Sequence, residues 1–219
     1  MLTGRRAERL NQLAEELRSS YGIKVLVSVF DIQQRDAVFN ALANESFLDD
    51  IDVLVNNAGI GGNGVTEECT PAQYHESFNV NVVGAIRCTQ QVLPGMRARK
   101  TGTIINITSI VGRIAALAQS PYVASKWDFE GVSEGLAQEV APFGIRVAII
   151  EPGVTKSSIF AKNIDAPNQS GAYDAHYRRM FAFYAAGITN ATPAEEVGAL
   201  IHHAITTDTP QLRYACSWA

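Results

Sequence analysis

Residues 102–126, GTIINITSIVGRIAALAQSPYVASK, decide the fold of this chain. The segment GTIINIT at 102–108 is a largely apolar strand of the kind buried inside a sheet, and a helix is expected over 121–142. A second apolar strand, GIRVAIIEP, follows at 144–152. Strand, helix and strand in this order predict a βαβ unit, whose right-handed crossover places the two strands parallel in one sheet.

The same alternation extends toward both ends of the chain. IKVLVSVF at 23–30 is almost continuously apolar, as strands buried on both faces of a parallel sheet are. A long helix begins at Thr70-Pro71, where a capping threonine precedes a proline at the first helical position. The remaining expected elements are helices over 5–20, 33–48, 70–99 and 193–206 and strands over 51–55 and 211–216. The prediction is an α/β fold with a doubly wound, Rossmann-like parallel sheet in a single domain over residues 1–219.

Length and composition agree with one α/β domain and argue against several other classes of protein. The chain has 219 residues, of which 47% are hydrophobic and 18% charged, as in ordinary globular domains. The net charge of −4 lacks the basic excess of a nucleic-acid binder. The three cysteines show neither metal nor disulfide spacing, so we expect no metal site and a cytoplasmic location. No apolar run reaches the length of a membrane span, so we expect no membrane partner.

Polar side chains from three consecutive strand-helix units are expected to meet at one edge of the sheet. Tyr122 and Lys126 lie one helical turn apart, so a phenol and an ammonium group can point into the same cleft. Ser109 ends the preceding strand, at the carboxyl edge where parallel sheets bind ligands. Asn81 lies in the middle of the long helix, and the strand before that helix ends in NNAG at 56–59. This convergence favours a catalytic site.

Each of these residues also has a structural interpretation. A tyrosine and a lysine at this spacing, taken alone, are a surface pair. Ser109 can cap the loop that follows its strand. The structural alternative is strongest for Asn81, because a mid-helix asparagine can bond its own backbone or a neighbouring strand.

With these residues in place, the chain resembles the classical short-chain dehydrogenase/reductase family over nearly its whole length. The motifs that carry the resemblance are LTGRR (2–6), FDI (30–32), NNAG (56–59), NVNVVG (79–84), INITS (105–109), YVASK (122–126) and EPGVTKS (151–157). The resemblance implies an oxidoreductase that transfers a hydride reversibly between a nicotinamide cofactor and an alcohol/ketone pair. The implied roles are Tyr122 as acid/base, Ser109 as donor to the substrate oxygen, Lys126 as holder of the nicotinamide ribose and Asn81 as seat of a water in a proton relay.

Elementary chemistry supports the roles of the tyrosine, the lysine and the serine. A phenol has an ordinary pKa near ~10, so Tyr122 needs a lower pKa to act as a base at neutral pH. The ammonium group of Lys126 favours the phenolate. Ser109 supplies a hydrogen-bond donor where charge builds on the substrate oxygen during hydride transfer.

Further cofactor contacts follow from the resemblance by position. The expected residues are Asp31 and Ile32 beside the adenine, Asn57, Ala58 and Gly59 beneath the ribose, Pro152, Gly153 and Val154 at the carboxamide, and Ser157, which stands where the family usually has a threonine. The family's acidic residue at the end of the second strand, which bonds the ribose hydroxyl of NAD, is replaced here by Gly4. Arg5 and Arg6 follow directly and suit a phosphate group, so we expect NADP(H) to be preferred over NAD(H). The alternative is that both arginines merely begin a charged helix.

The start of the chain departs from the family pattern. The glycine-rich phosphate loop between the first strand and the first helix is not found, because LTGRR already resembles the end of the second strand. GIGGNG at 59–64 lacks the GxGxxG spacing, and a substrate-side loop is the better interpretation. We therefore expect an N-terminally incomplete fold that binds a dinucleotide poorly as written. A non-catalytic, truncated or regulatory pseudo-enzyme is the alternative function.

The segment 155–190 is expected to form a substrate lid. It is rich in aromatic residues, namely Phe160, Tyr173, Tyr177, Phe181, Phe183 and Tyr184. An apolar lid favours a greasy secondary alcohol or ketone, such as a steroid or a retinoid, as the small-molecule substrate. The equally weighted alternative is a helix that packs these aromatics on the core. Dehydratase or epimerase chemistry on nucleotide sugars would need a larger C-terminal region than this chain has after the cofactor loop.

The resemblance also implies an assembly of identical subunits, a homodimer or a homotetramer.

Overall fold

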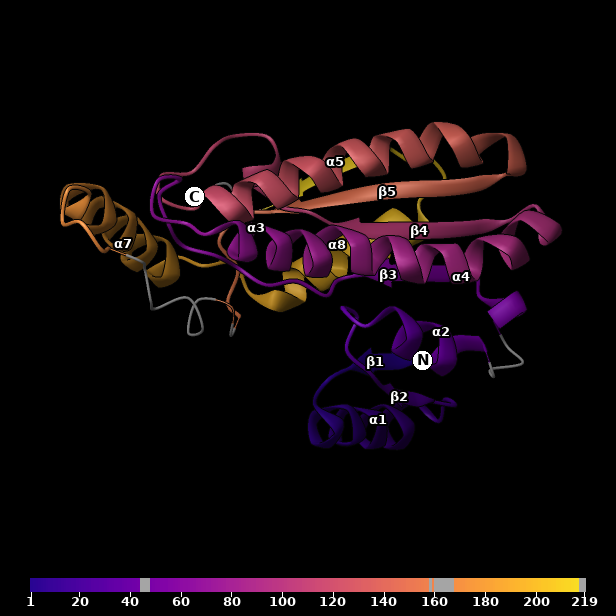
Figure 1. Cartoon of the computed structure of the whole chain (residues 1–219). Coiled ribbons are helices and arrows are strands. Elements are labelled where there is room, and N and C mark those ends of the chain that lie inside the picture. The colour runs from indigo at the N-terminus through magenta and orange to yellow at the C-terminus, as the bar shows by residue number, and fades with distance from the viewer. Residues whose placement is uncertain (44–47, 158, 160–167, 217–219) are drawn as a thin grey trace.

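The expected alternation of strands and helices is present in the computed structural model, which describes residues 1–43, 48–157, 159 and 168–216 (Figure 1). The strands are β1 (Leu2–Gly4), β2 (Val27–Val29), β3 (Val53–Asn56), β4 (Gly102–Ile107), β5 (Ile145–Pro152) and β6 (Arg213–Cys216). The helices are α1 (Ala7–Tyr21), α2 (Arg35–Ala43), α3 (Pro71–Phe78), α4 (Gly84–Arg99), α5 (Ser120–Val140), α7 (Asp174–Thr189) and α8 (Ala194–Thr206). Each expected helix and strand has a counterpart, with shifts of a few residues at the ends.

Four parallel strands form the main sheet in the order β3-β4-β5-β6. The register places Asn56 beside Asn106 and Ile107 beside Ile150. The carboxyl ends of the strands therefore reach one edge of the sheet, which is where parallel sheets of this class bind ligands.

The first two strands form a separate parallel pair, in which Leu2 lies beside Val27. The parallel sheet expected from the sequence is thus divided into two parts within the described residues. The strand expected over 23–30 shortens to β2, and its last residue, Val29, is 51% exposed. The expectation of a strand buried on both faces is wrong here, because β2 pairs only with the short β1 and lies at the edge of its sheet.

Helices cover both faces of the main sheet, as Figure 1 shows. Successive side chains of a strand point to opposite faces, so neighbouring residues enter different cores. Ile104 packs with Val92 of α4 and Val140 of α5 on one face. Ile105 packs with Ala204 of α8 on the other. The chain is therefore doubly wound, as its alternation predicts.

The long helix expected over 70–99 is present with one irregularity. Thr70 caps it reciprocally: its hydroxyl accepts from the Gln73 amide at 3.4 Å, and the Gln73 Oε1 accepts from the Thr70 amide at 2.7 Å. Between α3 and α4, the segment Asn79–Val83 winds as a π-helix. Such local widening is rare and is often found at functional sites. It positions Asn81, a candidate site residue. Within the described part of the chain, every helix falls short of the length or the hydropathy needed to cross a lipid bilayer.

Candidate active site

Ser109 and Tyr122 line one cavity of about 400 Å³ at the carboxyl edge of the main sheet. Ser109 follows β4 and caps the short 3₁₀ turn Ile110–Gly112. Tyr122 lies in the first turn of α5. Pro121 favours the start of this helix, because the backbone N–H that a proline lacks would have no partner within the helix at this position. The two hydroxyl groups expected to act together therefore come from two different elements into one space.

The Ser109 hydroxyl is oriented by backbone groups on both sides. It donates to the Pro152 carbonyl at 3.2 Å and accepts from the Val111 amide at 3.3 Å. Ser109 is only 8% exposed. Gly153 and Val154, which follow Pro152, line the same cavity. The expected cofactor-facing loop after β5 thus lies against the serine that is expected to contact the substrate.

Burial raises the pKa of the Tyr122 phenol, and a hydrogen bond with the Ser109 side chain only partly lowers it again. The sequence predicts the opposite, a pKa lowered by the ammonium group of Lys126. The Lys126 Nζ lies 5.8 Å from the centre of the Tyr122 ring, and desolvation of the phenolate is the largest cause of the raised pKa. Tyr122 is consequently a protonated phenol at neutral pH in this state.

Lys126 is almost fully buried, with 5% of its surface exposed. Its Nζ donates to the Ile107 carbonyl at 2.9 Å, at the end of β4. Burial lowers its pKa to about 8, and the carboxylate of Glu130 raises it in part. The ammonium form therefore predominates only below that pH, and its position close to the tyrosine agrees with the pairing expected from the YVASK motif.

Asn81 is fully buried and uses its side chain as a crosslink. Its Oδ1 accepts from the Ile60 amide at 2.8 Å, and its Nδ2 donates to the Ile60 carbonyl at 3.0 Å and to the Ser125 hydroxyl at 2.9 Å. The asparagine thus connects the loop after β3 to α5. This is close to the structural alternative considered above, and a role in a proton relay stays a prediction.

A second cavity, of about 630 Å³, collects the residues expected at the adenine end of the cofactor. Those among its lining residues are Arg5, Arg6, Asp31, Ile32, Asn57, Ala58 and Gly59. They come from the ends of β1, β2 and β3, and β1 and β3 are not paired with each other. Arg5 forms an ion pair with Asp31, with 3.6 Å between Nη1 and Oδ2.

These two cavities collect residues that would hold the two ends of a nicotinamide dinucleotide. A Cβ on Gly59 would lie 3.3 Å from the Asn81 Oδ1 and 3.9 Å from the Lys126 Nζ, so the backbone there passes close to Lys126 without a side chain of its own. The chain continues from Gly59, which lines the second cavity, to Gly61, which lines the first. A cofactor that follows this backbone would have arginines at one end and Lys126 at the other.

Ser157 does not join the other expected residues. Its side chain is exposed, accepts from the Ile159 amide at 3.4 Å and lines neither cavity. Its expected cofactor contact stays a prediction.

The aromatic segment divides between core and cavity. Tyr177 is buried with Val65 and Ala118, whereas Phe183 and Tyr184 line the cavity of Ser109. Packing on the core therefore holds for Tyr177, whereas a substrate lid over 155–190 stays a prediction, and Phe160 lies outside the described residues.

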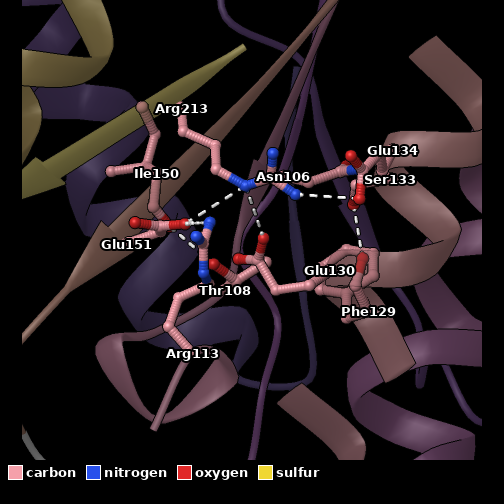
Figure 2. A network of polar contacts seen from close by, with 10 residues as sticks. All are labelled: Asn106, Thr108, Arg113, Phe129, Glu130, Ser133, Glu134, Ile150, Glu151 and Arg213. Atoms are coloured by element: carbon pink, nitrogen blue, oxygen red, sulfur yellow. Dashed lines mark hydrogen bonds and ion pairs between the residues drawn. The ribbon is translucent and has the colours of Figure 1, made fainter. Parts of the chain in front are cut away.

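A partly buried network of charges lies near the site, and the sequence patterns do not predict it (Figure 2). Arg213 of β6 lies between two carboxylates: its Nε is 3.1 Å from the Glu130 Oε2 and 3.4 Å from the Glu151 Oε1. Its Nη2 is 3.2 Å from the Glu134 Oε2, and the Arg113 Nη1 is 3.3 Å from the Glu151 Oε1.

The network joins every segment that carries a candidate site residue of the first cavity. Glu130 lies one turn after Lys126 on α5, Glu151 precedes Pro152, and Arg113 follows the turn capped by Ser109. Burial is the largest cause of the raised pKa of Glu151, and the neighbouring carboxylate of Glu130 adds to it. The spacing of Glu130 from Lys126 is a usable signal, but nothing in the sequence marks Arg213, because its partner is 83 residues away.

Comparison with known proteins decides the family. The sequence profile described as short chain dehydrogenase matches residues 1–168. This chain belongs to the short-chain dehydrogenase family. It is 33% identical over 210 residues to the oxidoreductase YusZ of Bacillus subtilis. The aligned region covers 93% of this chain and 75% of YusZ. Membership makes it an oxidoreductase of the NAD(P)-dependent dehydrogenase/reductase type.

Solved structures of the short-chain dehydrogenase family confirm the Rossmann-like α/β fold. A short-chain dehydrogenase from Streptomyces avermitilis matches with a TM-score of 0.82 at 32% identity, over 98% of this chain and 77% of that one. A metagenomic short-chain oxidoreductase in complex with NADP matches with a TM-score of 0.65 at 30% identity, over 69% of each chain.

Proposed function

We propose that this short-chain dehydrogenase reduces an apolar ketone to a secondary alcohol with NADP(H), and also catalyses the reverse oxidation. The observation that carries the proposal is the meeting of Ser109 and Tyr122 in one cavity, with the buried ammonium group of Lys126 beside the phenol. The bound nicotinamide would supply or accept the hydride. The protein residues then have to position the carbonyl and move the proton.

Tyr122 moves that proton. Its raised pKa keeps the hydroxyl protonated at neutral pH, so it can donate to the oxygen of a ketone that is being reduced. Ser109 turns its hydroxyl from the Pro152 carbonyl to the same oxygen and stabilises the charge that develops there. Oxidation of an alcohol needs the phenolate instead, which burial disfavours, so reduction is the favoured direction near neutral pH.

Lys126 holds the ribose of the nicotinamide nucleotide. Within the described part of the chain its Nζ donates one hydrogen bond, to the Ile107 carbonyl, and an ammonium group carries further donors for ribose hydroxyls. Its positive charge also helps Tyr122 to give up its proton.

The preference for NADP(H) rests on the arginines at the adenine end. Arg5 pairs with Asp31, whereas Arg6 has no ion pair among the described residues and lines the same cavity. A guanidinium group suits the additional phosphate of NADP(H) and gains little from a neutral hydroxyl. The relative solved in complex with NADP agrees with this choice.

The substrate class follows from the wall of the first cavity. Ile110, Val111, Ile114, Leu117 and Met180 contribute apolar side chains to it. Steroid- or retinoid-like ketones are therefore better candidates than sugars. The alternative of a non-catalytic pseudo-enzyme is not favoured, because the chain belongs to an oxidoreductase family and its serine and tyrosine share a cavity.

The test follows NADPH absorbance with a panel of apolar ketones, with the corresponding alcohols and NADP⁺ for the reverse reaction. We expect turnover with kcat/KM higher for NADPH than for NADH, by about 10- to 100-fold if one charge-assisted hydrogen bond to the phosphate decides. Arg6→Gln should remove most of that difference. Lys24→Gln, which removes an exposed positive charge outside both cavities, is the matched control. Equal kcat/KM values for the two cofactors in the parent protein would overturn the preference, and the absence of turnover with every ketone would overturn the function.

A further inference from the structure

One charged side chain stands out in the first cavity. Among the described residues that line it, Arg179 is the only charged one, and most of the others are apolar. Arg179 lies on α7, together with Met180 and Phe183, which also line the cavity. Ser109 and Tyr122 come from other elements. The cavity therefore combines a reactive end, apolar walls and a cationic group.

The Arg179 guanidinium has no counter-charge within the described part of the protein. It takes part in no ion pair or side-chain hydrogen bond there, and the cavity lining contains no carboxylate. Its neighbours one helical turn away on α7 are His176, Ala175, Ala182 and Phe183, so no acidic side chain lies at helical spacing. Arg178 differs, because its Nε donates to the Asp174 carbonyl and its side chain does not line the cavity.

A guanidinium group beside apolar walls is suited to bind an anion. The guanidinium is exposed to solvent, so its attraction to an anion depends on the salt concentration. The planar fork of N–H donors matches a carboxylate with two parallel hydrogen bonds. A substrate that is wholly apolar would leave this group without a partner.

We propose that the substrate is an apolar ketone or secondary alcohol that carries a carboxylate, and that Arg179 binds this carboxylate while the carbonyl lies at Ser109 and Tyr122. This inference rests on the proposed function and adds the chemical class of the substrate. The reaction remains a hydride transfer: the carbonyl carbon gains the hydride, Tyr122 provides the proton to the oxygen, and the carboxylate is unchanged. Arg179 is then a specificity-determining residue.

The experiment compares matched pairs of substrates. The probes are methyl-ketone carboxylic acids of increasing chain length, each beside its methyl ester, with NADPH as the reductant. The ester keeps the ketone and the apolar chain but lacks the negative charge. We expect kcat/KM to favour the acid over the ester by about 10- to 100-fold at the chain length that spans the cavity, as a charge-assisted hydrogen bond predicts. The ratio should fall as salt is added.

Variants of the two neighbouring arginines provide the control. Arg179→Gln should bring the ratio of acid to ester close to one, and Arg179→Lys should keep part of it because the charge remains. Arg178→Gln should leave the ratio as in the parent protein. Both residues are exposed, and glutamine has nearly the helix propensity of arginine, so the variants should fold.

Calorimetric binding of the same acid and ester separates this inference from the proposed function. If neither compound is reduced but the acid binds more tightly than the ester and Arg179→Gln abolishes the difference, the carboxylate site stands and the proposed reaction fails. A parent protein that binds or reduces the ester as well as the acid would overturn the inference. So would an unchanged ratio in Arg179→Gln.

Discussion

Replacement of Arg213 by leucine is expected to destabilise the fold strongly, because it leaves two buried carboxylates without their shared partner. Glu130 and Glu151 have side chains that are 7% and 10% exposed, and both lie within 3.4 Å of the Arg213 Nε. The leucine removes the positive charge between them and leaves Arg113 on Glu151 alone.

The magnitude follows from this burial. Removing one partner of a buried ion pair costs about 3–5 kcal/mol of folding free energy, since the remaining charge has lost its water. For a protein of this size, a change of that order lowers Tm by about 6–20 °C. The free energy of unfolding should be measured by urea titration and Tm by calorimetry.

The loss should also depend on pH, with a sign that can be worked out. The pKa of Glu151 is already raised above its ordinary value of 4.5, and loss of Arg213 raises it further. A carboxyl group with a raised pKa in the folded state binds its proton more readily there than in the unfolded chain. Its penalty is therefore absent below the ordinary pKa and grows as pH rises through the raised one. Arg213→Leu should cost more stability at about pH 8 than at about pH 5.

Arg113→Leu is the matched control for Arg213→Leu. It also removes an arginine from Glu151, but the Arg113 side chain is 51% exposed and contacts one carboxylate, so a loss of only about 0–1 kcal/mol is expected. Adding Glu130→Gln to Arg213→Leu should recover part of the stability, because one of the two stranded charges is gone. Equal effects of the two arginine substitutions, or an Arg213→Leu effect that is the same at both pH values, would refute this reasoning.

Three further predictions concern catalysis and packing. Tyr122→Phe removes the proton donor but keeps the ring, so kcat should fall by ~10² or more while Tm stays unchanged, and near-normal turnover would exclude the proposed acid. Activity that needs the ammonium form of Lys126 should decline as pH rises above about 8, the pKa to which burial lowers this group; a pH profile of kcat/KM that stays flat to higher pH would contradict this. Gly95→Ala would place a Cβ 2.7 Å from the Asp49 Cα, so we expect a loss of about 1–3 kcal/mol in a denaturant titration. Gly131→Ala has open space within 4 Å in a helix and should be neutral or stabilising by up to about 1 kcal/mol; a larger loss there than at Gly95 would show that packing is not the cause.

The order of the elements and the edge of the sheet that carries the candidate site can be predicted from the sequence because they depend on local signals. Apolar strands alternate with helices, and Thr70 with Pro71 marks the start of the long helix correctly. All strands of a parallel sheet end at the same edge, so the sequence alone predicts that Ser109 and Tyr122 lie together. The two residues do line one cavity.

The partners of buried polar groups and the balance between burial and charge are decided by the tertiary structure alone. Arg213 reaches Glu130 across 83 residues of sequence, and Arg179 joins the cavity only because α7 packs beside the loop after β4. The direction of the Tyr122 pKa depends on how completely the phenol is desolvated, which no spacing of residues reveals. Local periodicity determines the backbone of this chain, whereas the energies of its site come from contacts between segments that are distant in sequence and close only in the folded state.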